Sequence, residues 1–292
     1  MDLFSPPKLL LVNLGFLAMY VILFFFSKWL KGLLSSYKLD EQLTEYDNNA
    51  VSVSVAGYFI AVTIIFLGAI MPTGDGISAG EMPTSDIWEQ YLTVAAYSIG
   101  GILLLHLSRW LNARFILYKF SVDKEIVKDQ NPGTGVVEAG TYIASAMIIA
   151  GSIYGEGGGP LTALVFYSLG QIALMVFALL YAKLSPYDVH DEIEKDNVAA
   201  GLGFSGALIS IGIILMRAVA GEFGGWVADL TTFGIDVLVV FIYLIVVRFV
   251  FDKLILRNSD LNTEIAQDQN LGAGLLEMMV AICFSSVLFF AL

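Results

Sequence analysis

Long apolar stretches alternate with short polar segments along the whole chain. A helix needs about 20 mostly apolar residues to cross the hydrocarbon core of a bilayer. None of the stretches has the strict apolar–polar alternation of a membrane β-strand, and backbone groups inside lipid must bond to each other. The pattern therefore predicts an all-α polytopic membrane protein with eight transmembrane helices. The stretches lie at roughly 9–33, 50–71, 87–118, 134–154, 160–184, 198–220, 226–256 and 271–291.

The polar connections are of two alternating kinds. Those after the second, fourth and sixth stretches contain glycine but no Lys or Arg, and those after the other stretches carry, with their flanking helix ends, 13 of the 15 Lys and Arg. The positive-inside rule makes the cationic connections cytoplasmic and places both termini outside. The first stretch lacks a signal-peptide cleavage site, so we expect it to stay as a helix. The glycine-containing connections begin Pro72-Thr73-Gly74-Asp75-Gly76, Gly155-Glu156-Gly157-Gly158-Gly159 and Gly221-Glu222-Phe223-Gly224-Gly225.

Each cationic connection ends in a similar acidic phrase before a helix rich in small residues. The smallest repeat is therefore a hairpin of two helices, used four times in parallel. The second and fourth hairpins share Asp-Gln-Asn, and the first and third share Asp-Asn, so the higher repeat is two four-helix halves, 1–155 and 156–292. Asn and Asp are favoured N-caps, and the alternative is an acidic cytoplasmic mouth that gathers cations. The residues concerned are Asp47, Asn48, Asp129, Asn131, Asp196, Asn197, Asp268 and Asn270.

Three acidic residues fall inside predicted spans, where ionisable groups are costly and often functional. Glu138 and Glu277 each stand seven residues after the last Asn of their phrase, which places them about 10 Å inside their helices. They are candidate sites for a cation or a proton, and the alternative is that they only fix helix packing. Asp236 lies near mid-membrane and could pair with Arg217 of the preceding helix.

Composition narrows the classes of function. The chain is 57% hydrophobic and carries a net charge of −12, which argues against binding nucleic acid. The single cysteine, Cys283, forms no intrachain disulfide, and the chain has no CxxC or His/Cys cluster for a metal. No nucleophile triad or nucleotide loop is present either. We therefore expect no enzyme activity and no cofactor.

One stretch resembles a known family. The residues from Lys195 to Gly206, preceded by Ala182-Lys183-Leu184-Ser185-Pro186-Tyr187, resemble the YjfL-like family of bacterial inner-membrane proteins, catalogued as domain of unknown function 350. Its four-helix unit has an Asn-x-Ala-Ala-type helix start and often occurs in tandem. The first half keeps the Asn and loses the Ala-Ala. The resemblance implies a bacterial inner membrane and an association with envelope-stress or polyamine-related proteins, but no activity.

Two functional hypotheses follow from the sequence. The first is permeation or transport of small cations, protons or polyamines through Glu138 and Glu277, behind acidic mouths. The second is a non-transporting scaffold that recruits a cytosolic envelope-stress partner through its acidic linkers. The bilayer is the partner that both require, and the sequence does not fix an oligomeric state.

Overall fold

Eight long helices make up most of the protein. The computed structural model describes residues 7–71, 84–154, 158–250 and 260–291. In this part of the chain all eight are long and apolar enough to cross a membrane, which confirms the predicted spans. Those helices are α1 (Pro7–Leu34), α3 (Asn49–Ile70), α4 (Thr84–Phe115), α6 (Pro132–Ile153), α7 (Gly159–Leu184), α9 (Val198–Val219), α10 (Trp226–Val250) and α11 (Leu271–Ala291).

The described helix ends differ from the predicted windows by at most three residues, and α4 is shifted by three at both ends, since it begins at Thr84 rather than at 87. The third window runs to 118, but α4 ends at Phe115 because the N–H groups of Ile116 and Leu117 both turn back to the carbonyl of Asn112. The end of the seventh window, at 251–256, lies outside the described residues, as do Pro72–Gly76 and Gly155–Gly157.

A short helical linker precedes each of four long helices. The linkers are α2 (Leu39–Thr44), α5 (Val122–Val127), α8 (Val189–Glu194) and the π-helical turn η2 (Thr263–Gln267). After each linker one residue adopts a left-handed conformation, which turns the chain into the asparagine that follows; these residues are Asp47, Gln130, Asp196 and Gln269.

Asparagine side chains cap the helices that follow the linkers. Asn48, Asn131 and Asn197 each accept the backbone N–H of the residue three positions later, and Asn270 accepts those of Gly272 and Ala273. The capping thus lies with the asparagines. The aspartates of the same phrases are exposed, namely Asp47, Asp129, Asp196 and Asp268.

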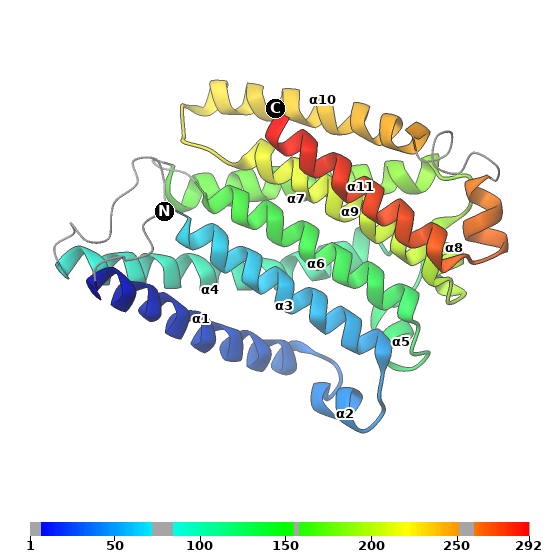
Figure 1. Ribbon diagram of the computed structural model, residues 1–292, viewed down its shortest axis with the longest axis horizontal. Helices are drawn as coiled ribbons and strands as arrows, with labels where there is room; N and C mark the ends of the chain where they lie inside the picture. The colour runs from blue at the N-terminus through cyan, green and yellow to red at the C-terminus, as the bar shows by residue number, and fades with distance from the viewer. Residues whose placement is uncertain (1–6, 72–83, 155–157, 251–259, 292) are drawn as a thin grey trace.

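The four capped helices, α3, α6, α9 and α11, lie side by side in that order as a row, which Figure 1 shows in cyan, green, yellow and red. Glycines bring their backbones together: Gly135 lies against Ala50, Gly201 against Gly133, and Gly274 against Ala199. A Cβ on any of these three glycines would overlap the backbone of the neighbouring helix. Small residues at such contacts permit close helix approach in membranes.

The same asparagines connect one linker to the next. The side-chain amide of Asn48 donates to the carbonyl of Ile126 at 2.8 Å, that of Asn131 to Ile193 at 2.7 Å, and that of Asn197 to Ile265 at 2.7 Å. These three bonds, the asparagine relay, place all four linkers on one side of the bundle. We call this the linker side.

The other long helices, α1, α4, α7 and α10, form a second layer. α4 packs on α3 and α6, and α7 packs on α6 and α9. Every residue of α6 and α9 is buried or half-buried, so the core lies around these two helices. α1 and α10 are the least buried of the candidate spans in the described chain, at 17% and 22% of their apolar windows.

Candidate functional site

Glu138 lies two turns inside α6, at the meeting of three helices. Its side chain is buried, with 2% of the residue exposed. Arg109 of α4 donates through Nε to Glu138 Oε1 at 2.8 Å, and the hydroxyl of Ser54 on α3 donates to Oε2. A buried carboxylate needs such partners, since an unpaired charge in this environment is very costly. The site is therefore an ion pair rather than a lone acid.

Arg109 connects Glu138 to the linker side. Its Nη2 donates at 2.5 Å to Oδ1 of Asp123 on linker α5, and Asp123 also accepts the hydroxyl of Ser36 at 2.9 Å. Burial would raise the pKa of Asp123, but the charge of Arg109 and these hydrogen bonds together hold the pKa below its usual value. Asp123 thus remains ionised at the linker end of this chain of charges.

Lys31 of α1 places a second cation beside Glu138. Only 2% of the residue is exposed. Its ammonium donates to the Tyr142 hydroxyl at 3.0 Å and lies 4.9 Å from the ring centroid of Tyr58 and 4.8 Å from that of Tyr142. Aromatic faces attract a cation, most strongly where water is excluded. Lys31 is therefore held by tyrosines, with no carboxylate within 4 Å among the described residues.

A cavity of about 540 Å³ opens beside these groups on the linker side, between α1, α4 and α5. Three cationic side chains line it with one carboxylate and a histidine, and Trp110 forms part of its rim at 62% exposure. The charged and ionisable lining residues are Lys31, Arg109, Arg114, Asp123 and His106. The electrostatic character of the described lining is therefore cationic.

Glu277 of α11 occupies the equivalent position in the second half, in a much tighter site. Tyr181 of α7 donates to Glu277 Oε1 at 2.8 Å, and Nη1 of Arg248 on α10 lies 3.7 Å from the same oxygen. Oε2 is buried without a hydrogen-bond partner among the described residues. The adjoining cavity has a volume of about 20 Å³, which is room for one water molecule.

The two sites differ at positions that correspond in the two halves. Arg109 and Arg248 each stand 29 residues before their glutamate. Lys31, however, corresponds to Tyr181, since each stands three residues before the matching helix end at Leu34 or Leu184. Ser54 corresponds to Gly203, at six residues past the cap. The first site thus has an extra cation and an open cavity, and the second is closed.

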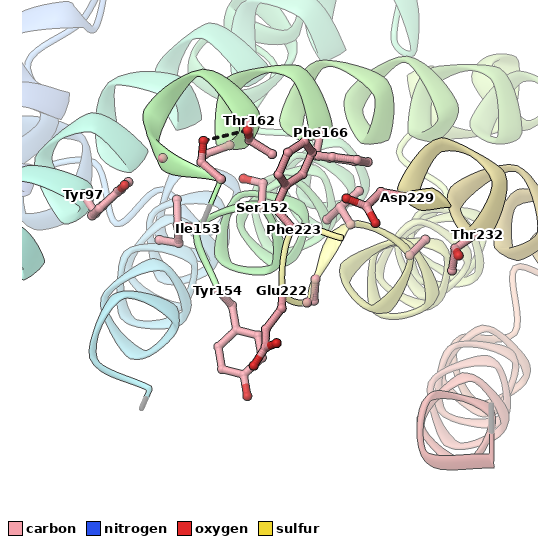
Figure 2. Close-up of a pocket in the computed structure, with 17 residues that line it drawn as sticks. Tyr97, Ser152, Ile153, Tyr154, Thr162, Phe166, Glu222, Phe223, Asp229 and Thr232 are labelled. Carbon is pink, nitrogen blue, oxygen red and sulfur yellow. Dashed lines mark hydrogen bonds between the residues drawn. The ribbon is translucent and has the colours of Figure 1, made fainter. Parts of the chain in front are cut away.

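A second pocket, of about 260 Å³, lies on the side opposite the linkers. Figure 2 shows its lining: Ser152, at the end of α6, faces Thr162 and Phe166 of α7, and Asp229 enters from α10. The Thr162 hydroxyl donates to the carbonyl of Gly158 at 2.7 Å. Asp229 and Glu222 give the pocket an acidic character, unlike the cationic cavity of the linker side.

Polar side chains lie buried between α4, α6 and α7. The Asn112 amide donates to Ser145 at 3.0 Å, Gln171 donates to Asn112 at 2.7 Å, and the hydroxyls of Ser108 and Tyr167 are 2.9 Å apart. Oε1 of Gln171 has no partner among the described residues. Buried polar groups in a spanning region are costly and are functional candidates by default.

Comparison with known proteins places the chain in a family. A family model described as Domain of Unknown Function (DUF350) matches residues 8–153 and again residues 157–292. The chain belongs to the DUF350 family. The double match confirms that this DUF350 chain is a tandem duplicate, as its resemblance to that family implies. It is also 24% identical to the UPF0719 transmembrane protein of Aquifex aeolicus (strain VF5) over 257 residues, which cover 86% of this chain and 89% of the relative. No solved structure matches it.

The acidic residues singled out in the sequence do not form one site in this DUF350 chain. Glu138 and Glu277 lie in separate units of the bundle, each with its own arginine. Asp236 is buried on α10, at 7% exposure, but no ion pair within 4 Å joins it to Arg217 among the described residues. The aspartates of the linker phrases are exposed, whereas both glutamates are buried.

Sequence reasoning missed the partners of the glutamates. It grouped Arg109 and Arg248 with the cations that flank the membrane, whereas both reach inward to a buried carboxylate. Lys31 and Tyr181 were likewise not identified. The equal spacing of 29 residues between each arginine and its glutamate is the signal in the sequence that could have revealed the pairs.

Proposed function

We propose that this DUF350 chain is a membrane transport protein that takes up a small anionic solute through the cavity on the linker side of its first half. The observation that supports this is the charge of the lining, where Lys31, Arg109 and Arg114 face Asp123. Arg109 is shared with Glu138, whereas the direct partners of the Lys31 ammonium among the described residues are a phenol hydroxyl and two aromatic rings, with no carboxylate within 4 Å. An anion would therefore gain a buried cation that lacks a direct counter-charge. Such an interaction is stronger there than in water.

The buried polar residues support movement across the membrane rather than binding alone. Asn112 and Ser108 lie on α4, the helix that also supplies Arg109 to the cavity and Tyr97 to the pocket on the opposite side. With Gln171 they offer hydrogen bonds to a solute in the interior of the bundle, between α4, α6 and α7. The two pockets would be the ends of the proposed route.

A small cation fits the first-half cavity poorly, because it would have to bind next to Lys31 and Arg109. Glu277 is the stronger candidate for the proton site of the first hypothesis, because its Oε2 has no hydrogen-bond partner in the described part of the chain and adjoins a cavity the size of one water molecule. That space is too small for a polyamine. We propose that Glu277 exchanges a proton during transport.

The scaffold hypothesis has less support, because many linker acids already have partners within the chain. Lys119 bonds to Asp188 at 2.5 Å and to Asp191 at 2.7 Å, and Lys124 bonds to Asp129 at 2.8 Å. Acids that are already engaged offer less free charge to a basic cytosolic partner.

The orientation belongs to the same proposal. We propose four parallel hairpins in a bacterial inner membrane, with the linker side in the cytoplasm and both termini outside, because the Lys and Arg residues concentrate around the linkers. The anion cavity would then open to the cytoplasm and the acidic pocket to the periplasm.

Uptake into liposomes tests the function. The purified full chain is reconstituted, and uptake of phosphate, acetate and chloride is measured beside uptake of potassium, putrescine and protons. Lys31→Gln removes the buried cation, and Lys28→Gln is the matched control, since it removes a half-buried cation one turn earlier on α1 that pairs with Asp40. We expect uptake of at least one of the anions, reduced about tenfold or more by Lys31→Gln, a loss of about 1.4 kcal/mol. Lys28→Gln should leave uptake unchanged.

Three results would contradict the proposal. These are uptake of cations without anions, equal anion uptake by the two lysine variants, and no uptake of any of the probes. Glu277→Gln distinguishes the proposed proton exchange from anion binding. We expect this variant to abolish proton movement, while anion binding at the first-half cavity persists.

A further inference from the structure

The cavity on the linker side of the first half has a buried cation at its inner end and apolar side chains at its mouth. Lys31 and Tyr142 line the inner end, with 2% and 1% of each residue exposed. Leu34 of α1 and Trp110 of α4 line the mouth, with 55% and 62% of each residue exposed. A molecule with an anionic head and an apolar body would therefore match the lining from the inner end outward.

The formal charges around this cavity leave a single positive charge. Lys31, Arg109 and Arg114 line it as cations, and the carboxylates are Asp123, which also lines it, and Glu138, which pairs with Arg109. Three cations against two carboxylates leave one positive charge for a ligand to neutralise. A second negative charge on the ligand would lie close to Asp123 and Glu138, and like charges repel strongly where water is scarce. The charge balance thus favours a monovalent anion.

The size and the apolar part of the lining exceed what an inorganic anion needs. The cavity has a volume of about 540 Å³, and pockets of roughly 300–1,000 Å³ hold molecules of drug size. Ala113, Phe120 and Val122 add to the apolar lining formed by Leu34 and Trp110. Chloride or phosphate would leave these side chains in contact with water, whereas an apolar body would bury them, which is favourable in proportion to the area buried.

We propose that the ligand of this cavity is a monovalent anion with an apolar body, of the class of alkyl and aryl carboxylates. Its anionic head would lie beside Lys31, and its apolar body would lie against Leu34 and Trp110. The inference rests on the proposed function and narrows the small anionic solute to one chemical class. A free carboxylate and the head of an anionic phospholipid share this chemistry, since both join a single negative charge to an apolar chain.

Binding of a series of carboxylates tests the inference. The purified full chain in a nonionic detergent is titrated by calorimetry with acetate, butyrate, hexanoate and octanoate. Octanamide is the neutral probe, and suberate is the dicarboxylate with the chain length of octanoate. Trp110→Ala removes the aromatic ring at the mouth. Trp29→Ala is the matched control, because Trp29 is 61% exposed on α1 and lies outside the described lining of the cavity.

We expect the affinity to rise about twofold to fourfold for each added methylene, the upper value being that of full burial. Octanoate should bind about tenfold or more tightly than octanamide and suberate. Trp110→Ala should remove most of the dependence on chain length, whereas Trp29→Ala should keep it. Lys31→Gln should weaken the binding of octanoate about tenfold and leave that of octanamide unchanged.

Four results would overturn the inference. Equal affinities for acetate and octanoate would exclude the apolar body but leave the proposed anion uptake standing. The same dependence on chain length in the two tryptophan variants would show that the chain enters the micelle rather than the cavity. Binding of suberate as tight as that of octanoate would exclude the single charge. Failure of every carboxylate to bind would contradict the proposed function as well.

Phosphatidylglycerol, added at one molecule per protein chain, distinguishes the two sources of the ligand. Competition with octanoate by this lipid, but not by phosphatidylcholine, would support the inference with an anionic lipid head as the occupant. Octanoate binding that neither lipid changes would support it with a free carboxylate as the occupant.

Discussion

The exchange Asn131→Asp removes an amide donor from the middle of the row while it keeps the oxygen that caps α6. The amide donates to the Ile193 carbonyl at 2.7 Å and to Oε2 of Glu125 at 3.3 Å, and Asn131 is fully buried. The first bond is neutral and contributes about 1 kcal/mol, and the second, to a charged group, contributes about 1.5–3 kcal/mol. We therefore expect Asn131→Asp to destabilise the protein by roughly 2–4 kcal/mol, or roughly 5–10 °C in melting temperature.

The matched control is Asn270→Asp at the end of the row. This residue also caps a helix and donates to the glutamate of its own linker, Glu264, but it is exposed and is not bonded to a following linker among the described residues. Water screens the added charge there, so we expect a loss below about 1 kcal/mol. The assay is thermal unfolding in detergent micelles, followed by far-UV circular dichroism. Equal shifts for the two variants would refute the reasoning that the relay stabilises the row.

Two further variants test the packing and the linker charges. Gly135→Ala should destabilise the protein by about 1–3 kcal/mol, because the added Cβ would overlap the backbone at Ala50. The control is Gly234→Ala on α10, which faces open space and should be neutral or stabilising by up to about 1 kcal/mol. Equal melting temperatures for the two variants would contradict this reasoning. The pKa of Asp123 is lowered in the fold, so its stabilisation is present above the ordinary aspartate range and is lost as the pH falls through the lowered value. Asp123→Asn should therefore flatten the acid limb of a plot of melting temperature against pH, and an unchanged acid limb would show that the Arg109–Asp123 pair does not contribute.

The sequence predicts most of this fold because the hydropathy of a span is a local property. The eight spans follow from apolar length alone, and the asparagine phrases correctly mark where four of the helices begin. The role of the aspartates in the same phrases could not be separated from that of the asparagines, since both residue types are good caps. Only the backbone conformation shows that Asp47 and Asp196 make the turn and leave the capping to their neighbours.

The candidate site was only half predictable. Glu138 and Glu277 stand out as acids in apolar helices, but their partners depend on how helices far apart in the sequence rotate toward each other. Arg109 lies near a helix end, where a cation ordinarily reaches toward the headgroups. The cavity was not predictable at all, because it arises where a unit of the repeat carries Lys31 in place of the tyrosine that closes the second half.

The direction of the asparagine relay has a consequence for the order of events during synthesis. Each amide donates forward along the chain, from Asn48 to Ile126, from Asn131 to Ile193 and from Asn197 to Ile265. When the pair of helices that carries one of these asparagines leaves the ribosome, the carbonyl that will accept its amide still lies 62 to 78 residues further along the chain. The amide must therefore first bond to water or to its own linker. Arrival of the next pair replaces that water with a backbone carbonyl and docks the new helix through its glycines. The bundle is thereby built in one direction in time, from the first pair of helices to the last.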